Sequence, residues 1–158
     1  TGVAEPVPGN LLETFPDARF LHIHRQPYEV FPSLRHTMKK VIAAWGVQKL
    51  DESTLEDRAI ETYRRLYDAY FAQVGDIPPG HFHEISYQQL SEQPLEALSG
   101  AYDALGLPDF SVVQPKIEEY LATVSSYERN KYPDLSPEVK ARLVSEWKPM
   151  FDAWGYEA

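Results

Sequence analysis

The amino-acid sequence predicts an α/β fold, with a partial parallel sheet of about two strands flanked by a mostly helical C-terminal half. Two short β-rich segments, 18–24 and 81–87, stand among segments whose apolar residues have helical spacing. Helices that alternate with buried strands are typical of a parallel sheet. Two parallel strands are too few to form a sheet on their own, so we expect further strands from outside this chain or from a partner.

Prolines delimit the first elements. A short helix directly before Pro16 is followed by segment 18–24 (ARFLHIH), which is rich in β-formers and predicts a buried strand. Pro27 suits the first turn of a helix, where its missing N–H costs nothing. We expect this helix to reach about Gly46 and to bend or restart at Pro32.

The later part of the chain predicts four more helices and the second strand. Thr54 and Asp57 have the spacing of a helix start. Apolar residues then keep helical spacing from Ile60 to Val74, which predicts a long amphipathic helix. Segment 81–87 (HFHEISY) is the second strand. The remaining helices are expected around 95–105, 117–124 and 136–154.

Composition and charge exclude several classes of protein. The 158 residues correspond to about one domain. A net charge of −9 argues against general binding to nucleic acid or anionic membranes. The absence of cysteine excludes disulfides, thiol catalysis and Cys-ligated zinc. No apolar run is long enough to span a bilayer. We expect a cytoplasmic protein, and the start at Thr1 indicates a piece of a longer chain.

A candidate anion site follows the first predicted strand. Arg25 stands at its carboxyl end, and Ser33 lies eight residues later on the same strand–turn–helix unit. Ligands of open α/β sheets bind at the carboxyl ends of strands, and helix N-termini favour anions. A guanidinium fork with a hydroxyl suits a phosphate monoester. The alternative is an arginine that pairs with a loop carboxylate and an ordinary helical serine.

Histidines occur in two H-x-H pairs, His22/His24 and His81/His83, one on each predicted strand. The period of two places both rings of a pair on one face. If the strands are neighbours, four imidazoles would form a zinc or iron site. No carboxylate is an obvious further ligand, and strand histidines often fill half-buried positions. We therefore expect no functional metal.

Two other segments bear on ligand binding. Gly75 and Gly80 have the spacing of a phosphate loop but lie between a helix and a strand, in the reverse order. We interpret this segment as a turn, so the chain contains no phosphate loop. Tyr87 follows a strand and precedes a turn, where ligands gather. Arg129 and Lys131 form a basic spot in a polar loop, either a solvated loop or an anion clamp.

Together these segments resemble the C-terminal portion of a PAPS-dependent sulfotransferase of the bacterial type. The most specific element is R-x-P-x-x-x-x-x-S, from Arg25 to Ser33. The resemblance implies a P-loop-type fold and a nucleotide-binding transferase. The segments that resemble the family are residues 15–34 (FPDARFLHIHRQPYEVFPSL), 83–108 and 130–139, with Trp-Gly-Tyr at 154–156.

The resemblance implies roles for individual residues. Arg25 and Ser33 match the pair that holds the 3′-phosphate of the co-substrate PAPS or its product PAP. Tyr87 matches the tyrosine that contacts the adenine. Arg129 and Lys131 fall in the loop that folds over the nucleotide in similar enzymes, although the R-K-G pattern is absent. Such a site needs no metal.

The resemblance also indicates what the chain lacks. The loop K-x-G-T-T/S, which binds the 5′-phosphosulfate, and the catalytic base have no counterpart, so no catalytic residue is identified. Gln26 stands where the family usually has Asp or Asn. We interpret residues 1–158 as the C-terminal part of a single sulfotransferase-like domain. It would supply the 3′-phosphate and adenine side for sulfuryl transfer to a hydroxyl or amine of a small-molecule or carbohydrate acceptor.

Two other functions stay open. One is half of another P-loop phosphotransferase of the kinase type, which would bind ATP with Mg²⁺. The other is a non-catalytic interaction fragment. The edge of strand 18–24 would be uncovered in the isolated chain, and such an edge is a template for association. We expect the isolated chain to self-associate or pair with the missing N-terminal half, and not to transfer sulfate.

Overall fold

The computed structural model describes residues 7–45, 52–126 and 130–158. The chain divides into two structural units, each built from segments that are distant in the sequence. Unit 1 comprises residues 1–24 and 72–130, and unit 2 comprises residues 25–71 and 131–158. The strands belong to unit 1, whereas the long helices belong to unit 2.

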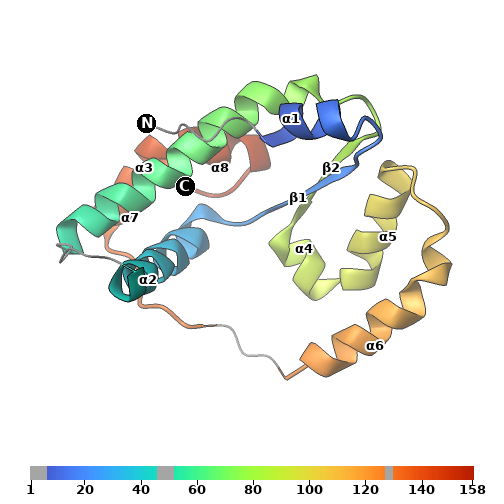
Figure 1. The fold of residues 1–158 in the computed structure, drawn as a ribbon. Coiled ribbons are helices and arrows are strands. Elements are labelled where there is room, and N and C mark those ends of the chain that lie inside the picture. The colour runs from blue at the N-terminus through green and yellow to red at the C-terminus, as the bar shows by residue number, and fades with distance from the viewer. Residues whose placement is uncertain (1–6, 46–51, 127–129) are drawn as a thin grey trace. The chain divides into compact units, whose positions relative to one another are not determined.

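Unit 1 contains the predicted pair of parallel strands. β1 (Phe20–His24) and β2 (Phe82–Ser86) pair in parallel along their whole length, and both are shorter than the predicted segments. Figure 1 shows the two strands side by side. Ile85 is buried at 5% exposure, whereas Leu21 and Ile23 on the same face remain 38% and 44% exposed. The β1 part of this face is thus the less covered.

In unit 1, one helix precedes β1 in the sequence and three helices follow β2. A side-chain cap begins α4: the Ser86 hydroxyl accepts from the Gln89 backbone N–H, and the Gln89 side chain accepts from the Ser86 N–H. Tyr87 is therefore the first residue of a helix, and the expectation of a turn after it is wrong. The helices are α1 (Val7–Thr14), α4 (Tyr87–Glu92), α5 (Pro94–Ala104) and α6 (Gln114–Val124), with 3₁₀ turns at Val74–Asp76 and Phe110–Val112.

Unit 2 is built from four helices, and proline chemistry explains where two predictions fail. α2 runs unbroken through Pro32, which removes only one backbone hydrogen bond, so the predicted restart is wrong. The last predicted helix is interrupted at Trp147, because Pro149 cannot donate to the preceding turn and its ring would clash there. The helices are α2 (Pro27–Trp45), α3 (Glu52–Gln73, the last two residues in unit 1), α7 (Pro137–Glu146) and α8 (Lys148–Trp154).

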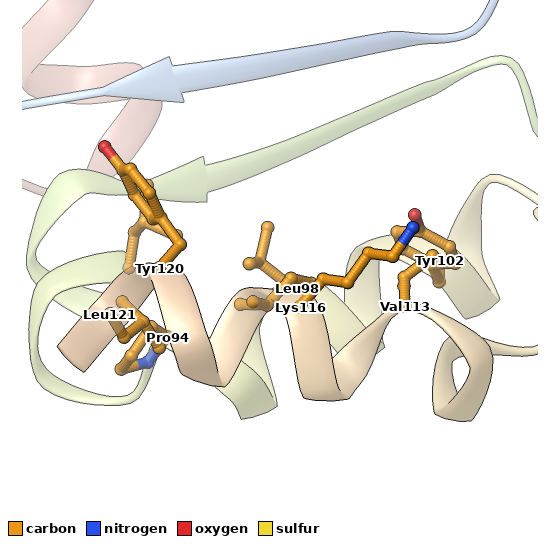
Figure 2. A pocket seen from close by; sticks show the side chains of 9 residues that line it. Pro94, Leu98, Tyr102, Val113, Lys116, Tyr120 and Leu121 are labelled. Carbon is orange, nitrogen blue, oxygen red and sulfur yellow. The ribbon is translucent and has the colours of Figure 1, made fainter. Parts of the chain in front are cut away.

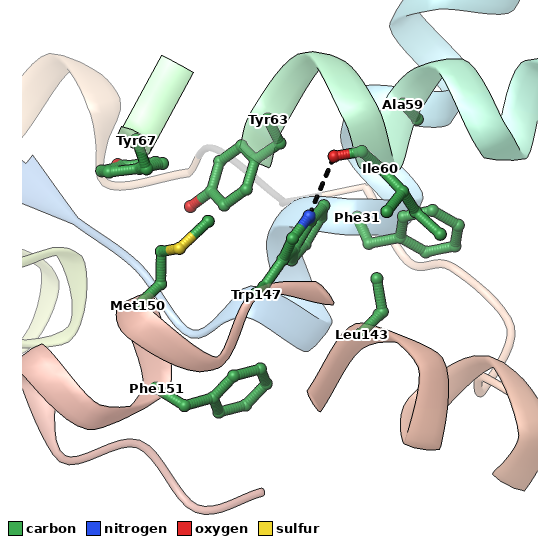
Figure 3. Close-up of a cluster of buried hydrophobic side chains, with 9 residues drawn as sticks. All are labelled: Phe31, Ala59, Ile60, Tyr63, Tyr67, Leu143, Trp147, Met150 and Phe151. Carbon is green, nitrogen blue, oxygen red and sulfur yellow. Dashed lines mark hydrogen bonds between the residues drawn. The ribbon is translucent and has the colours of Figure 1, made fainter. Parts of the chain in front are cut away.

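The core of unit 2 surrounds the indole of Trp147, which is fully buried (Figure 3). Its Nε1–H donates to the backbone carbonyl of Ile60 on α3 at 3.0 Å. The ring lies 4.2 Å from Tyr63 and 6.0 Å from Phe31 of α2, measured between centroids. One side chain thus joins α2, α3 and the break between α7 and α8. The cluster also contains Ala59, Tyr67, Leu143, Met150 and Phe151.

We predict that Trp147→Ala lowers the free energy of unfolding by about 3–5 kcal/mol, because it leaves a cavity and removes a buried hydrogen bond. Denaturant titration measures the loss. The matched control is Leu66→Ala on α3, whose side chain is 61% exposed, and it should change stability by less than about 0.5 kcal/mol. Equal losses in the two variants would contradict the central role of the indole.

Candidate functional site

An arginine–carboxylate pair stands at the start of α2. Arg25 directly follows β1 in the chain, and its Nε donates to Oε2 of Glu29 at 2.6 Å. The two side chains are 33% and 52% exposed, so the pair is accessible to solvent. The alternative of a paired arginine is therefore realised in this structure, although the carboxylate comes from the helix and not from a loop.

Ser33 lies on α2, one turn after Glu29, and is half-buried. Residues four apart share a helix face, so Glu29 and Ser33 lie on one side of α2. Arg25 reaches that side through its bond to Glu29. Phe31 lies between them in sequence but points into the core, where it is fully buried. The Arg25–Glu29 pair and Ser33 therefore lie near the same side of the first turns of α2, and the joint role of Arg25 and Ser33 stays a prediction.

The C-terminal residues of unit 2 lie beside the same turn. The Gln26 side-chain amide donates to the backbone carbonyl of Glu157 at 3.3 Å. Its Oε1 is buried and has no hydrogen-bond partner among the residues that the structure describes. Burial raises the pKa of Tyr156 to about 12; the charges of Glu29 and Tyr67 add to the rise, and Arg25 opposes it. The Tyr156 phenol therefore stays protonated at neutral pH.

Tyr156 was missed as a site residue. Its only sequence signal is the terminal Trp-Gly-Tyr, which contributes weakly to the resemblance. More than a hundred residues separate Tyr156 from Arg25, and no local spacing relates them. The charges of Arg25 and Glu29 both act on the pKa of Tyr156, so we include Tyr156 in the candidate site.

Lys131 also belongs to unit 2, where it is exposed at the start of an extended segment. The next residue, Tyr132, packs edge-on against His36 of α2, with ring centroids 5.7 Å apart. His36 lies three residues after Ser33, so this segment contacts the helix that carries the serine. A cavity of about 450 Å³ opens there, lined by residues 132–136 together with Arg35, His36 and Lys39 of α2.

The remaining predicted site residues lie elsewhere. Tyr87 belongs to unit 1, where it is half-buried and directly follows β2 in the chain. Its backbone carbonyl accepts from the Ser91 hydroxyl at 2.7 Å. Arg129 lies outside the described residues. Unit 2 thus contains Arg25, Ser33 and Lys131, and unit 1 contains Tyr87.

The strand register rules out the four-histidine cluster. The strands are neighbours, but His22 stands opposite Glu84, whereas His83 stands opposite Leu21. Paired residues share a face and successive residues alternate, so the two H-x-H pairs lie on opposite faces. Across the described parts of the chain, no group of three or more His, Cys, Asp or Glu side chains is arranged to hold a metal ion.

A carboxylate that the sequence analysis overlooked pairs with one histidine. Nδ1 of His22 lies 2.9 Å from Oε1 of Glu84, and the rings of His22 and His24 have centroids 6.3 Å apart. Burial lowers the pKa of His24, with nearby His22 lowering it further and the charge of Glu84 opposing. The sequence places Glu84 on the second strand, but only the register reveals its partner.

Comparison with known proteins shows the family. A family model described as "Sulfotransferase family" matches residues 8–111. The chain belongs to the sulfotransferase family. A solved structure, the crystal structure of sulfotransferase STF9 from Mycobacterium avium, has the same fold, with a TM-score of 0.71 and 22% identity. That match covers 91% of this chain and 38% of STF9. The predicted α/β fold of P-loop type is thereby confirmed.

Curated sulfotransferases of two mycobacteria are similar to this chain. Each carries the name omega-hydroxy-beta-dihydromenaquinone-9 sulfotransferase Stf3, one in Mycobacterium tuberculosis (strain CDC 1551 / Oshkosh) and one in Mycobacterium bovis (strain ATCC BAA-935 / AF2122/97). Both are 35% identical to this chain over 147 residues, which are 93% of the chain and 38% of each relative. The chain thus spans less than half the length of these relatives. Within the described ranges, the chain has no helix that is both long and apolar enough to cross a bilayer.

We predict that His24 titrates below its usual value of 6.5 and that its two neighbours shift its pKa in opposite directions. Glu84→Gln should lower the pKa further, because it removes the charge that favours the imidazolium. His22→Gln should raise it. Titration of the imidazole NMR signals measures both shifts, and shifts of the same sign would contradict this geometry.

The same shift predicts the pH dependence of stability. A lowered pKa in the folded state means that the unfolded chain binds the proton more readily. The contribution of His24 is therefore present above pH 6.5 and is lost as the pH falls below that value. Denaturant titrations between neutral and mildly acidic pH should show a smaller loss of stability in His24→Gln than in the unchanged protein.

Proposed function

We propose that this sulfotransferase chain supplies the 3′-phosphate and adenine side of a PAPS site, as the C-terminal part of a single domain. The protein that contains it would transfer a sulfuryl group from PAPS to an acceptor hydroxyl or amine. The observation that carries this proposal is the Arg25 guanidinium at the start of α2, bonded to Glu29, which precedes Ser33 by one helical turn. Tyr87 would contact the adenine, and Lys131 would interact with the nucleotide, as would Arg129, which lies outside the described residues.

The chemistry around Arg25 suits a 3′-phosphate. A guanidinium binds phosphate oxygens through parallel charge-assisted hydrogen bonds. α2 has 19 residues, and the positive end of its dipole lies beside Arg25. The Ser33 hydroxyl would donate one further hydrogen bond to the phosphate. Tyr156, protonated at neutral pH, is a second hydroxyl donor in the same surroundings.

Glu29 has a different effect on this site. Its carboxylate occupies Nε of the guanidinium and adds negative charge beside the proposed phosphate. An exposed ion pair of this kind is worth about 0–1 kcal/mol, less than a charge-assisted bond to a dianion. We infer that Glu29 orients the guanidinium through Nε while a phosphate approaches its other nitrogens.

In-line sulfuryl transfer would rest on positioning and on positive groups near the bridging oxygen, by analogy with phosphoryl transfer. The residues described here would hold and orient the nucleotide, and none is assigned to the reacting atoms. PAPS would be the co-substrate and PAP the product. The donor chemistry requires no metal ion.

The acceptor class comes from the curated relatives. Their name denotes a hydroxyl group on a dihydromenaquinone, which is a hydrophobic small molecule. This chain is 35% identical to them over 93% of its own length. We propose an acceptor of the same broad kind, a hydroxyl on a hydrophobic small molecule.

We predict that the protein binds PAP more tightly than AMP, which lacks the 3′-phosphate. Arg25→Ala should weaken PAP binding by about 1.5–3 kcal/mol, the scale of a hydrogen bond to a charged group. Calorimetry with both nucleotides measures the difference. The matched control is Arg64→Ala, because Arg64 is similarly exposed (36%) and also pairs with a helical carboxylate, and PAP affinity should not change.

Two outcomes would contradict the proposal. Equal affinity for PAP and AMP would remove the role of the 3′-phosphate. Binding of ATP with Mg²⁺, together with transfer of its phosphoryl group, would instead indicate a phosphotransferase. A labelled-PAPS assay on the protein as encoded in full separates these reactions.

We predict a smaller effect from the serine. Ser33→Ala removes one hydroxyl donor and should weaken PAP binding by about 1 kcal/mol, with AMP binding unchanged. Thr37→Ala, an exposed position one turn later on α2, is the matched control and should leave both affinities unchanged. If Ser33→Ala weakened PAP and AMP equally, the hydroxyl would not contact the 3′-phosphate.

A further inference from the structure

Unit 2 contains a cavity beside the later turns of α2, to which the proposed nucleotide site assigns no group. Its volume is about 450 Å³, within the range of small-molecule sites. We call it the basic cavity. Its lining comes from one face of α2, from Leu55 of α3, and from residues 132–136 and 139.

Positive charge collects on the α2 wall of the basic cavity. Arg35, His36 and Lys39 lie on neighbouring positions of that helix, because residues three or four apart share a face. Of the described residues that line the cavity, Asp134 alone carries a carboxylate. The lining thus has two permanent cations and an imidazole against one negative charge, although the chain as a whole has a net charge of −9.

The polar groups on this wall are largely available to a ligand. Among the described residues, Arg35 pairs with the carboxylate of Glu56 alone, at 3.9 Å between Nη1 and Oε2. Glu56 is shared with Arg142, which lies closer to it, at 3.5 Å. The ring of His36 contacts Tyr132, but its nitrogens have no hydrogen-bond partner in the same described part of the chain. An oxyanion would satisfy these donors.

The remaining walls of the basic cavity are mostly apolar. Leu55 is buried at 5% exposure, and Leu135 and Val139 add hydrocarbon surface. The ring of Tyr132 lies edge-on to His36, with centroids 5.7 Å apart. An inorganic ion would leave this apolar surface in water, whereas an apolar group on the ligand would cover it, which is favourable.

A cavity of similar volume in unit 1 has a different lining. The apolar groove between α5 and α6 has a volume of about 410 Å³ (Figure 2). Lys116 is the only charged residue among the described residues that line it, and Figure 2 shows it among apolar side chains such as Leu98 and Val113. Volume alone therefore does not distinguish the two cavities. The concentration of cations and available donors indicates an anionic ligand for the basic cavity.

We propose that the basic cavity binds an organic anion, a small molecule with one sulfonate, sulfate or carboxylate group on an apolar ring or chain. Arg35 and Lys39 bind the oxyanion together with His36, and the guanidinium suits the parallel oxygens of such a group. Two permanent cations and one carboxylate leave a lining charge of +1, which a single negative charge balances. The apolar part of the ligand packs against Tyr132 and Leu135. The proposal does not depend on the proposed function.

Calorimetry with three probes tests the proposal on the protein as encoded in full. Naphthalene-2-sulfonate is the organic anion, naphthalene-2-sulfonamide is its uncharged counterpart, and methanesulfonate is the charged group without the rings. The naphthalene sulfonate should bind at least tenfold more tightly than either other probe, because only this probe uses both the cations and the apolar surface. Its affinity should fall as the ionic strength rises, because salt screens exposed charges. The C–S bond of a sulfonate leaves no sulfuryl group to transfer.

Variants of α2 test the role of the individual charges. Arg35→Gln and Lys39→Gln should each lower the affinity for naphthalene-2-sulfonate about fivefold, the effect of one exposed ion pair. Their affinity for the uncharged sulfonamide should stay within twofold of the unchanged protein. The matched control is Lys40→Gln, because Lys40 is an exposed lysine of the same helix that does not line the cavity. It should keep the sulfonate affinity within twofold.

A further variant tests the apolar wall. Tyr132→Ala should weaken binding of naphthalene-2-sulfonate and of the sulfonamide by the same factor, because both place their rings in the cavity. Denaturant titration should show that Arg35→Gln and Lys39→Gln keep the stability of the unchanged protein within about 0.5 kcal/mol, as is usual for surface substitutions. Saturating PAP should leave the sulfonate affinity within twofold, because the proposed nucleotide contacts are not in the lining.

Several results would overturn the proposal. If the sulfonamide binds as tightly as the sulfonate, the cavity does not recognise the charge. If methanesulfonate binds as tightly, the apolar surface has no role. Equal losses in Arg35→Gln and Lys40→Gln would indicate attraction by the overall charge of α2. Displacement of the sulfonate by PAP would assign the cavity to the nucleotide site, and the absence of sulfonate binding at millimolar concentration would remove the organic-anion site altogether.

Discussion

The indole N–H of Trp147 donates to the carbonyl of Ile60 inside a cluster of buried side chains. A buried donor without a partner would cost about 1–3 kcal/mol, so this bond restricts how the last two helices pack on α3. Phe31 packs against the same indole, and this contact determines which side of α2 turns inward. Because Phe31 points into the core, Glu29 and Ser33 lie on the more exposed side of α2. Arg25 binds Glu29 on that side.

The charges around the start of α2 differ from the overall charge of the chain. The chain has a net charge of −9, yet the surroundings of Arg25 combine a cation, a helix N-terminus and a protonated phenol. The carboxylate of Glu29 adds a negative charge beside them. The ordinary tyrosine pKa of 10.0 already keeps the phenol neutral at physiological pH, and burial raises the pKa of Tyr156 further, to about 12. Tertiary packing can thus place a few favourable groups around one arginine on an acidic protein.

Unit 1 has two apolar surfaces of different shape. Leu21 and Ile23 are exposed along β1. An apolar groove between α5 and α6 is lined by side chains that include Leu98 and Ile117. An exposed strand edge favours pairing with another polypeptide strand, because its backbone N–H and C=O groups can form hydrogen bonds with that strand. A concave apolar surface with a polar rim instead suits a small hydrophobic molecule. The two surfaces therefore differ in the kind of contact that they favour.

The sequence alone determined the local elements and the family. β-formers between Pro16 and Pro27 marked β1, Pro27 marked the start of α2, and the Arg25–Ser33 interval carried the resemblance that the comparisons bear out. Pro149 also stood in the sequence, so the break between α7 and α8 was predictable from proline chemistry. Such features depend on residues that are close in the sequence, so the spacing of residue types predicts them.

Contacts between groups that are distant in the sequence follow from how the elements pack. Periodicity places His22 on a face of its strand, but the register of β1 against β2 pairs it with Glu84 and separates the two histidine pairs. Tyr156 joins Arg25 and Glu29 because the C-terminal residues return to the start of α2. A one-residue slip or a different helix packing would change these contacts without changing any local pattern, because hydrophobic periodicity specifies the buried face of an element and not its partner.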